Sequence, residues 1–306
     1  MKYAVEVSNL KKAYGKFKAV KGISFKIKKG EIFGLLGPNG AGKTTTINIL
    51  SDLLTKDSGR VKILGKEVNE VKDLTNTATA YSWMTGIIKT RENLKVFAKL
   101  YNVQNPDERI DYLMKLLDID RLRNKKTYSL SSGETTRLNL CKGLINKPKV
   151  LLLDECTVGL DPVVAIKTRK VLKELQRKEK TTILFTTHMM QEAEELCDRI
   201  AFISHGKIIK IGTPKELKKL IDKQIIRIDF MPSDKNIEQF LKKQGFDVLY
   251  FKDNKTSIGV KHASEQLHKI LHPILKAGFK IKDLNVRKPT LEEFKLIYEE
   301  ISNSRF

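Results

Sequence analysis

The segment GLLGPNGAGKTTTINIL, residues 34–50, constrains the fold more than any other part of the chain. An apolar run ends at Gly37, a glycine-rich turn follows, and Lys43 opens a stretch with helical apolar spacing through Leu54. Gly37 to Thr44 fits G-x-x-x-x-G-K-[ST], the P-loop, in which backbone N–H groups converge on phosphate oxygens. The pattern therefore predicts a strand, a phosphate-binding loop and a helix, in that order.

The P-loop residues have separate expected roles at a nucleoside triphosphate. Lys43 places a positive charge on the β- and γ-phosphates, and the Thr44 hydroxyl is placed to ligate Mg²⁺. The strand, loop and helix context makes the match specific, because chance rarely supplies it. The residues expected to bind the triphosphate in this region are Gly37, Pro38, Asn39, Gly40, Ala41, Gly42, Lys43, Thr44 and Thr45.

A pair of acidic residues ends the apolar run VLLLDE, residues 150–155. Such a run is typical of a parallel strand buried on both faces, and ligands gather at the carboxyl ends of these strands. We expect Asp154 to hold Mg²⁺ through water, and Glu155 to orient or deprotonate the attacking water. A strand that merely ends in solvated acids is the alternative, which the P-loop upstream disfavours.

The order of the apolar patterns predicts an α/β fold. Residues 3–33 alternate short β-type runs with turns, which indicates an antiparallel part leading into the P-loop. Helical spacing over residues 91–117, interrupted at Asn105-Pro106, indicates a helical insertion. TTILFTTH, residues 181–188, repeats the buried-strand pattern. Strands that alternate with helices predict a parallel sheet core with helices on both sides.

The pattern changes near Thr213-Pro214, and a second set of elements follows a linker at about residues 218–224. Its runs predict, in order, strand 225–230, helix 234–243, strand 246–251, strand 256–260, helix 263–277 and strand 279–286. This βαββαβ order is the ferredoxin-like plan, and a last amphipathic helix follows Pro289. The expected domains are residues 1–220, with a helical subdomain at about 91–146, and a small α+β domain over 221–306.

Composition limits the classes of protein that this chain represents. The formal net charge is +22, which favours either attraction to polyanions or a solvated lysine-rich surface. We find no secretory leader and no run of about 18 apolar residues, so we expect a cytosolic chain.

Cys141, Cys156 and Cys197 are far apart, which predicts buried free thiols. His268 and His272 lie four apart without an evident third metal ligand.

Residues 128–162, YSLSSGETTRLNLCKGLINKPKVLLLDECTVGLDP, resemble the part of ABC ATPases that runs from the signature loop to the acidic strand end. The family's loop reads LSGGQ, and this chain has LSSGE. The resemblance implies that the loop closes over the γ-phosphate of ATP held by a second subunit, through Ser131, Ser132, Gly133 and Glu134. Ser131 and Glu134 also fit a capping box that opens a helix to Asn146, and a helix N-terminus itself binds anions.

Three further positions extend the resemblance over about residues 3–220. Tyr14 resembles the aromatic residue that stacks on adenine. Asp161 resembles the D-loop aspartate, which communicates across a dimer. His188 resembles the switch histidine that senses the γ-phosphate.

The chain also departs from the family pattern. No glutamine stands in the Q-loop region around Ala80, so slower hydrolysis or a different coupling geometry is expected there. Cys156 replaces a proline, which is expected to loosen the turn without touching the chemistry. Trp83, the only tryptophan, lies where the family docks a coupling helix of the membrane subunit. An interface anchor and local core packing both stay open for this residue.

The resemblance implies an ABC-type ATPase with ATP and Mg²⁺ as cofactors, with Glu155 and His188 as catalytic residues, and with a second copy of itself or a related subunit as partner. The closing VRKPTLEEFKLIYEEI resembles ATPase subunits of ABC-2 type exporters, which implies export through separate membrane permease subunits at the inner face of the cell membrane. No specific nucleic acid is expected. Two alternatives stay open: a soluble nucleic-acid- or ribosome-associated ABC ATPase, suggested by the charge, and a degenerate ATP-binding partner of a more active subunit, suggested by the missing glutamine.

Overall fold

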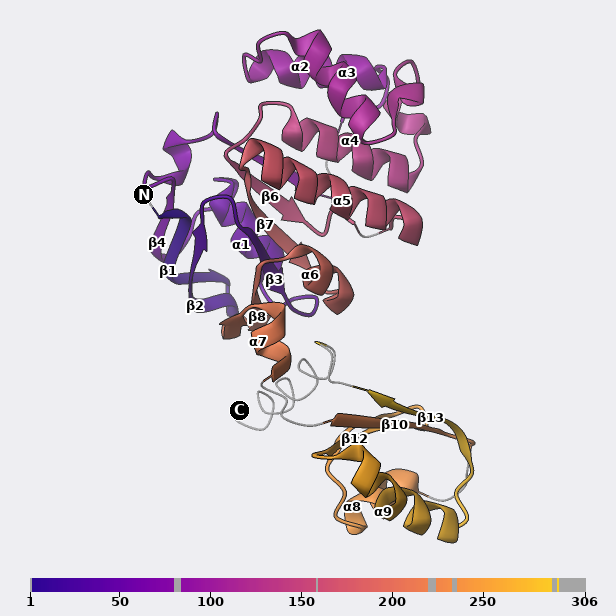
Figure 1. Ribbon diagram of the computed structural model, residues 1–306. Coiled ribbons are helices and arrows are strands. Elements are labelled where there is room, and N and C mark those ends of the chain that lie inside the picture. The colour runs from indigo at the N-terminus through magenta and orange to yellow at the C-terminus, as the bar shows by residue number, and fades with distance from the viewer. Residues whose placement is uncertain are drawn as a thin grey trace. The chain divides into compact units, whose positions relative to one another are not determined.

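The computed structural model describes residues 2–79, 84–157, 159–219, 224–232 and 236–287, together with Leu291. The chain divides into two compact units, residues 1–213 and 214–306, whose elements are labelled in Figure 1. Ala80, Trp83 and the amphipathic helix expected after Pro289, apart from Leu291, lie outside the described residues.

A six-stranded sheet forms the centre of the first unit. Its strands, in spatial order, are β5 (Thr75–Thr79), β6 (Val150–Asp154), β7 (Thr182–Thr187), β3 (Ile32–Leu36), β8 (Arg199–Ser204) and β9 (Lys207–Gly212). Neighbouring strands from β5 to β8 pair in parallel, and β9 pairs antiparallel with β8 at the edge. Every residue of β3, β6 and β7 is buried, which confirms the strands predicted from unbroken apolar runs.

A three-stranded antiparallel sheet forms from two strands that precede the P-loop in the sequence, as predicted, and a third strand that follows the loop. β1 (Tyr3–Tyr14) is its central strand and pairs with β2 (Phe17–Lys28) and β4 (Ser58–Ile63). Buried side chains of these strands share one apolar cluster with side chains from the central sheet and from α1 (Lys43–Leu50). The P-loop is therefore held between two sheets that pack through a common core.

The helical insertion consists of α2 (Thr90–Leu100), α3 (Pro106–Leu116) and α4 (Ser132–Leu144), which pack against one another at the top of Figure 1. The helical segment is interrupted at Asn105-Pro106, where the sequence predicted it. Asn105 has a left-handed φ of 49°, and Pro106 occupies the first helical position, where its missing N–H costs nothing. Two further helices of this unit are α5 (Pro162–Glu179) and α6 (Met190–Leu196).

Two helices of the first unit are shorter than the sequence pattern suggested. α1 ends at Leu50 rather than reaching Leu54, and α4 ends at Leu144 rather than Asn146. A left-handed residue follows each end, with φ of 58° at Asp52 and 49° at Lys147. A right-handed helix does not continue through such a residue, so apolar spacing overestimates both lengths.

The second unit has the strand order β11-β12-β10-β13 with every neighbouring pair antiparallel, which is the sheet of a ferredoxin-like fold. Its elements are α7 (Pro214–Lys219), β10 (Gln224–Phe230), α8 (Ile237–Lys243), β11 (Val248–Lys252), β12 (Lys255–Val260), α9 (Ala263–Lys276) and β13 (Ile281–Arg287). Side chains of α8 and α9 share one apolar core with the sheet. α8 begins later than the predicted residue 234, because the Asn236 side chain caps it by accepting from the Gln239 N–H at 2.9 Å.

The three cysteines are buried free thiols, as predicted. Burial raises the pKa of each thiol far above its usual value. Within the described ranges, no helix combines the length and the apolar character needed to cross a membrane.

Candidate active site

The backbone of the P-loop passes too close to its neighbours for side chains at two of its glycines. A Cβ at Gly37 would lie 2.1 Å from the Ile203 carbonyl oxygen, and one at Gly42 would lie 2.6 Å from the Ala19 carbonyl oxygen. Gly42 also has a φ of 103°, which L residues rarely adopt. The glycines predicted from the motif are thus required by the local geometry.

The P-loop leads directly into the N-terminus of α1. Gly42 is the N-cap, and the first N–H with a partner one turn back is that of Thr46, which donates to the Gly42 carbonyl at 3.0 Å. The N–H groups of Lys43, Thr44 and Thr45 precede that bond, so they are the orphan donors of the helix. Such donors and the positive end of the helix dipole make a binding site for phosphate oxygens.

The ammonium group of Lys43 lies against the backbone of this loop. Its side chain is only 4% exposed, and Nζ donates to the carbonyl oxygens of Gly37 at 2.9 Å and Pro38 at 3.0 Å. The same Nζ lies 3.1 Å from Glu155 Oε1. A buried ammonium requires such partners, and the oxygens of a bound triphosphate are the natural competitors for it.

The acidic end of β6 lies two strands away from the P-loop strand, with β7 between them. Asp154 is buried, and its Oδ1 accepts a hydrogen bond from the Thr186 hydroxyl at 2.6 Å. The Glu155 N–H donates to the same residue, at 3.1 Å to Oγ1 and 3.2 Å to the carbonyl oxygen. Glu155 has a left-handed φ of 49°, so its side chain leaves the strand direction.

His188 completes a group of three side chains from distant parts of the sequence. Its Nδ1 lies 3.4 Å from Glu155 Oε1, the oxygen that also pairs with Lys43. The carboxyl ends of β3, β6 and β7 meet at one edge of the parallel sheet, which explains why residues near 43, 155 and 188 converge. A cation, a carboxylate and an imidazole at a phosphate-binding loop are suited to hydrolysis of a phosphoanhydride.

The donors expected for Mg²⁺ are a hydroxyl and a carboxylate. Thr44 is exposed at the start of α1, and Asp154 ends β6 on the same edge of the sheet as the P-loop. Mg²⁺ commonly takes one or two protein oxygens and fills its octahedron with substrate phosphates and water. These two residues fit that donor set.

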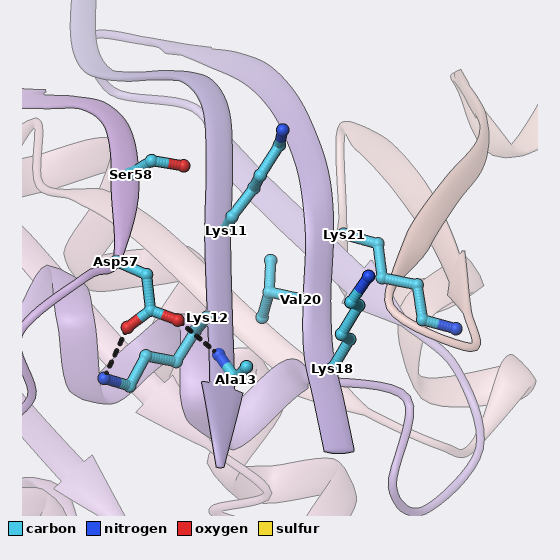
Figure 2. A pocket seen from close by; sticks show the side chains of 8 residues that line it. All are labelled: Lys11, Lys12, Ala13, Lys18, Val20, Lys21, Asp57 and Ser58. Atoms are coloured by element: carbon cyan, nitrogen blue, oxygen red, sulfur yellow. Dashed lines mark hydrogen bonds and ion pairs between the residues drawn. The ribbon is translucent and has the colours of Figure 1, made fainter. Parts of the chain in front are cut away.

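A basic pocket of about 400 Å³ adjoins the P-loop on the three-stranded sheet, and Figure 2 shows its lining. A methyl group of Val20, one of its lining residues, lies 3.4 Å from the position of a Cβ on Gly42. The four lysines of the pocket are Lys11, Lys12, Lys18 and Lys21. Sequence reasoning missed them, although the run KKAYGKFKAVK around Tyr14 carries the signal, because only the β1–β2 pairing brings them together.

Asp57 fixes one of these lysines beside Tyr14. Its carboxylate accepts from Lys12 Nζ at 2.9 Å and from the Ala13 N–H at 2.7 Å, drawn as dashed lines in Figure 2. The hydrogen bond from Lys12, followed by that from Ala13, lowers the pKa of Asp57. Lys12 Nζ also lies 6.0 Å from the centroid of the Tyr14 ring, which is half exposed. Tyr14 is thus a half-exposed aromatic residue next to Ala13, which lines the basic pocket.

The capping box predicted at the signature loop is present. Ser131 Oγ accepts from the Glu134 N–H at 3.2 Å, and Glu134 Oε2 accepts from the Ser131 N–H at 3.0 Å. Glu134 also pairs with Arg121 at 2.8 Å. Ser131 and Ser132 are exposed, and no hydrogen bond or ion pair between described residues connects this loop to the P-loop of its own chain.

Asp161 serves as a helix cap. It is the N-cap of α5, and its Oδ1 accepts from the Val163 N–H at 2.9 Å, with Pro162 at the first helical position. The residue expected to form the D-loop therefore lies at the start of a helix, six residues after Glu155 in the sequence.

A P-loop opposed by strand-end acids and a histidine defines the chain as a P-loop ATPase. The family model described as ABC transporter matches residues 20–158, and the model of the ATP-binding protein DrrA1-3-like C-terminal domain matches residues 212–294. The linearmycin resistance ATP-binding protein LnrL of Bacillus subtilis is 37% identical over 70% of this chain and 70% of its own length. The daunorubicin resistance ATP-binding protein DrrA3 of Streptomyces coeruleorubidus is 31% identical over 95% of this chain and 94% of its own length.

Solved structures that resemble this chain include an ABC transporter protein. The structure of cbiO1 from Clostridium perfringens, part of the ABC transporter complex cbiONQ, has a TM-score of 0.63 at 29% identity and covers 72% of this chain and 94% of that one. The chain belongs to the ATP-binding proteins of ABC transporters. It is an ATP-hydrolysing subunit of this family, which confirms the main interpretation of its sequence.

Proposed function

We propose that two copies of the chain bind two MgATP molecules between them, each between the P-loop of one copy and the signature loop of the other. Two observations support this arrangement. First, Ser131 and Ser132 are exposed at the N-terminus of α4. Second, no hydrogen bond or ion pair between described residues connects their loop to the P-loop of the same chain. A helix N-terminus that is open to solvent is suited to the γ-phosphate of a nucleotide on a partner chain.

Glu155 is the proposed catalytic base, and the convergence of Lys43, Glu155 and His188 is the observation that carries this role. When Lys43 binds the phosphate oxygens, its ion pair with Glu155, 3.1 Å long, opens. Glu155 Oε1 is then free to accept a hydrogen bond from water. His188, beside the same carboxylate, then donates to the γ-phosphate. Magnesium held by Thr44 and Asp154 would neutralise charge on the β- and γ-oxygens.

Export is the proposed use of the hydrolysis energy, through separate membrane subunits at the inner face of the cell membrane. LnrL and DrrA3 are named for resistance to linearmycin and to daunorubicin. Other relatives are named Nod factor export ATP-binding protein I. Ile87, just before the helical subdomain, and Tyr128 within it offer a docking surface. Both are about 70% exposed, and the Tyr128 N–H donates to the carbonyl of Gly86, which precedes Ile87.

The Glu155→Gln variant tests the catalytic assignment. We expect it to bind MgATP, to accumulate as a dimer in light scattering, and to hydrolyse ATP at least about 100-fold more slowly, because a general base contributes about 10²- to 10⁴-fold. Glu174→Gln, an exposed position on α5, is the control and should turn over ATP normally. Normal turnover by Glu155→Gln would remove Glu155 from the mechanism, and absence of the dimer would contradict the shared site.

Purification from gently solubilised membranes tests the partner. We expect a polytopic membrane protein in stoichiometric amount, lost when both Ile87 and Tyr128 are replaced by Asp. Recovery with RNA or ribosomes instead would favour the nucleic-acid alternative, for which the net charge of +22 would then be the leading clue.

A further inference from the structure

Glu192 on α6 is a buried carboxylate that the proposed mechanism does not use. The residue is 2% exposed, and each of its oxygens has partners. Oε2 accepts hydrogen bonds from the hydroxyls of Thr157 at 2.8 Å and Thr187 at 2.9 Å. Oε1 lies 3.0 Å from Nη1 of Arg169, which is itself buried. A charge so deeply buried persists only because these groups replace water around it.

The two threonines belong to the segments that carry the catalytic side chains. Thr157 follows Glu155 by two residues, and Thr187 directly precedes His188. The Thr187 hydroxyl also accepts from the Met189 N–H at 3.0 Å, and its carbonyl accepts from the P-loop N–H of Gly37 at 3.3 Å. One carboxylate oxygen therefore ties the turn after β6 to the last residue of β7.

The third partner connects this tie to α5, the helix that starts at the D-loop. Arg169 lies on α5 and pairs with two glutamates of α6, Glu192 at 3.0 Å and Glu195 at 2.9 Å. Glu195 is 42% exposed in its side chain and, in its described contacts, touches neither threonine. Of the two glutamates, only Glu192 reaches the catalytic segments.

We propose that Glu192 is a positioning residue for ATP hydrolysis, which sets the position of Glu155 relative to His188 and links both to α5. The inference rests on the proposed roles of these two residues. Glu155 and His188 are already 3.4 Å apart, so a shift of about 1 Å between their segments changes the alignment of water with the γ-phosphate, a misplacement that costs on the order of 10²-fold in rate. Nucleotide binding depends mainly on the P-loop and is spared.

The Glu192→Gln variant separates positioning from general stability. We expect kcat for ATP to fall at least about tenfold, which corresponds to about 1.4 kcal/mol of transition-state stabilisation, while the dissociation constant for ATP stays within about twofold. Glu195→Gln is the matched control, because it also removes a partner of Arg169 but leaves the threonines tied; its kcat should change by less than about twofold. Equal losses in the two variants, or a parallel loss of ATP affinity in Glu192→Gln, would overturn the proposal.

Threonine variants test the tie even if Glu192→Gln folds poorly. Thr157→Val and Thr187→Val each remove one hydroxyl at nearly constant shape, and both should lower kcat severalfold. Thr168→Val is their control, since its buried hydroxyl donates only to the Val164 carbonyl of its own helix at 2.9 Å. Where Glu192→Gln folds, the two threonine effects should disappear in its background, because a double-mutant cycle detects the shared partner. Full additivity would contradict the tie.

The proposed function and this inference fail in different ways. If Glu155→Gln retains normal turnover, the catalytic assignment fails and the positioning role falls with it. If Glu155→Gln is inactive while Glu192→Gln and both threonine variants keep the normal kcat, the inference about Glu192 alone is wrong.

Discussion

The two units of the chain bury different kinds of side chain. The first unit buries charged residues across its fold: Glu31, Lys43, Arg109, Arg137, Asp154, Arg169 and Glu192. In the described part of the second unit, the buried polar residues are Thr256 and Ser257, and no charged side chain is buried. Its core is an apolar layer between one sheet and two helices.

This difference separates a catalytic part from a packed part. Buried charges cost desolvation energy and persist only with well-placed partners, as Lys43 and Glu192 illustrate. Three of the buried charges, Lys43, Asp154 and Glu192, lie at or next to the carboxyl edge of the parallel sheet. The described part of the second unit gains its stability from apolar area removed from water.

The largest effect that sharpens this comparison is expected in the core of the second unit. Ile228→Ala deletes a fully buried side chain and should destabilise this unit by about 2–5 kcal/mol in urea unfolding, because it leaves a cavity. ATP turnover of the full chain should stay within about twofold. Val286→Ala, a 43% exposed position of the same sheet, is the control and should cost less than about 0.5 kcal/mol. Loss of turnover in parallel with unfolding would break the division of roles.

A smaller effect is expected at the basic pocket of the first unit. Lys18→Gln combined with Lys21→Gln removes two positive charges beside the P-loop and should weaken ATP binding about 3- to 10-fold at low salt. The difference should shrink at about 0.5 M salt, since screening removes the attraction. Lys16→Gln combined with Lys28→Gln removes the same charge outside the pocket and should leave the affinity unchanged. Equal weakening in both double variants would mean that only the overall charge acts.

The smallest effect is expected at the signature loop. The Ser131 N–H, and after it Arg121, lowers the pKa of Glu134 below its ordinary 4.5. A lowered pKa in the folded protein stabilises it above about pH 4.5, and this contribution is lost as the pH falls through the folded value. Glu134→Gln keeps the capping geometry but not the charge, so its Tm should lie about 1–2 °C below wild type at pH 7. The two melting temperatures should converge as the pH falls through the folded-state pKa of Glu134, and a constant difference would contradict the assignment.

The sequence was sufficient for much of the candidate site. The P-loop, the acidic pair Asp154-Glu155 and the capping box at Ser131 are local patterns in which neighbours along the chain dictate the conformation. The structure brings Lys43, Glu155 and His188 together, as expected from strands that end at one edge. Their functional roles stay predictions. The domain boundary near residue 220 and the effect of the missing Q-loop glutamine around Ala80 on hydrolysis or coupling also stay predictions.

Other features could not be read from the sequence because they depend on pairing between distant segments. The basic pocket requires the antiparallel register of β1 and β2, and Asp57 joins it from β4. A glutamate in QEAEEL reads as one of several solvated acids, and nothing local distinguishes Glu192 from its exposed neighbour Glu195. Helix ends at Asp52 and Lys147 were missed for the related reason that left-handed residues carry no apolar signal.

The sequence by itself determined the alternation of strands and helices, the P-loop ATPase class and the residues at the ends of the catalytic strands, because short-range sterics and apolar periodicity fix these features. Only the tertiary structure decided which polar groups are buried together. Burial raises the energetic weight of each hydrogen bond, so the tie from Glu192 to Thr157 and Thr187 acquires its importance from the fold around it.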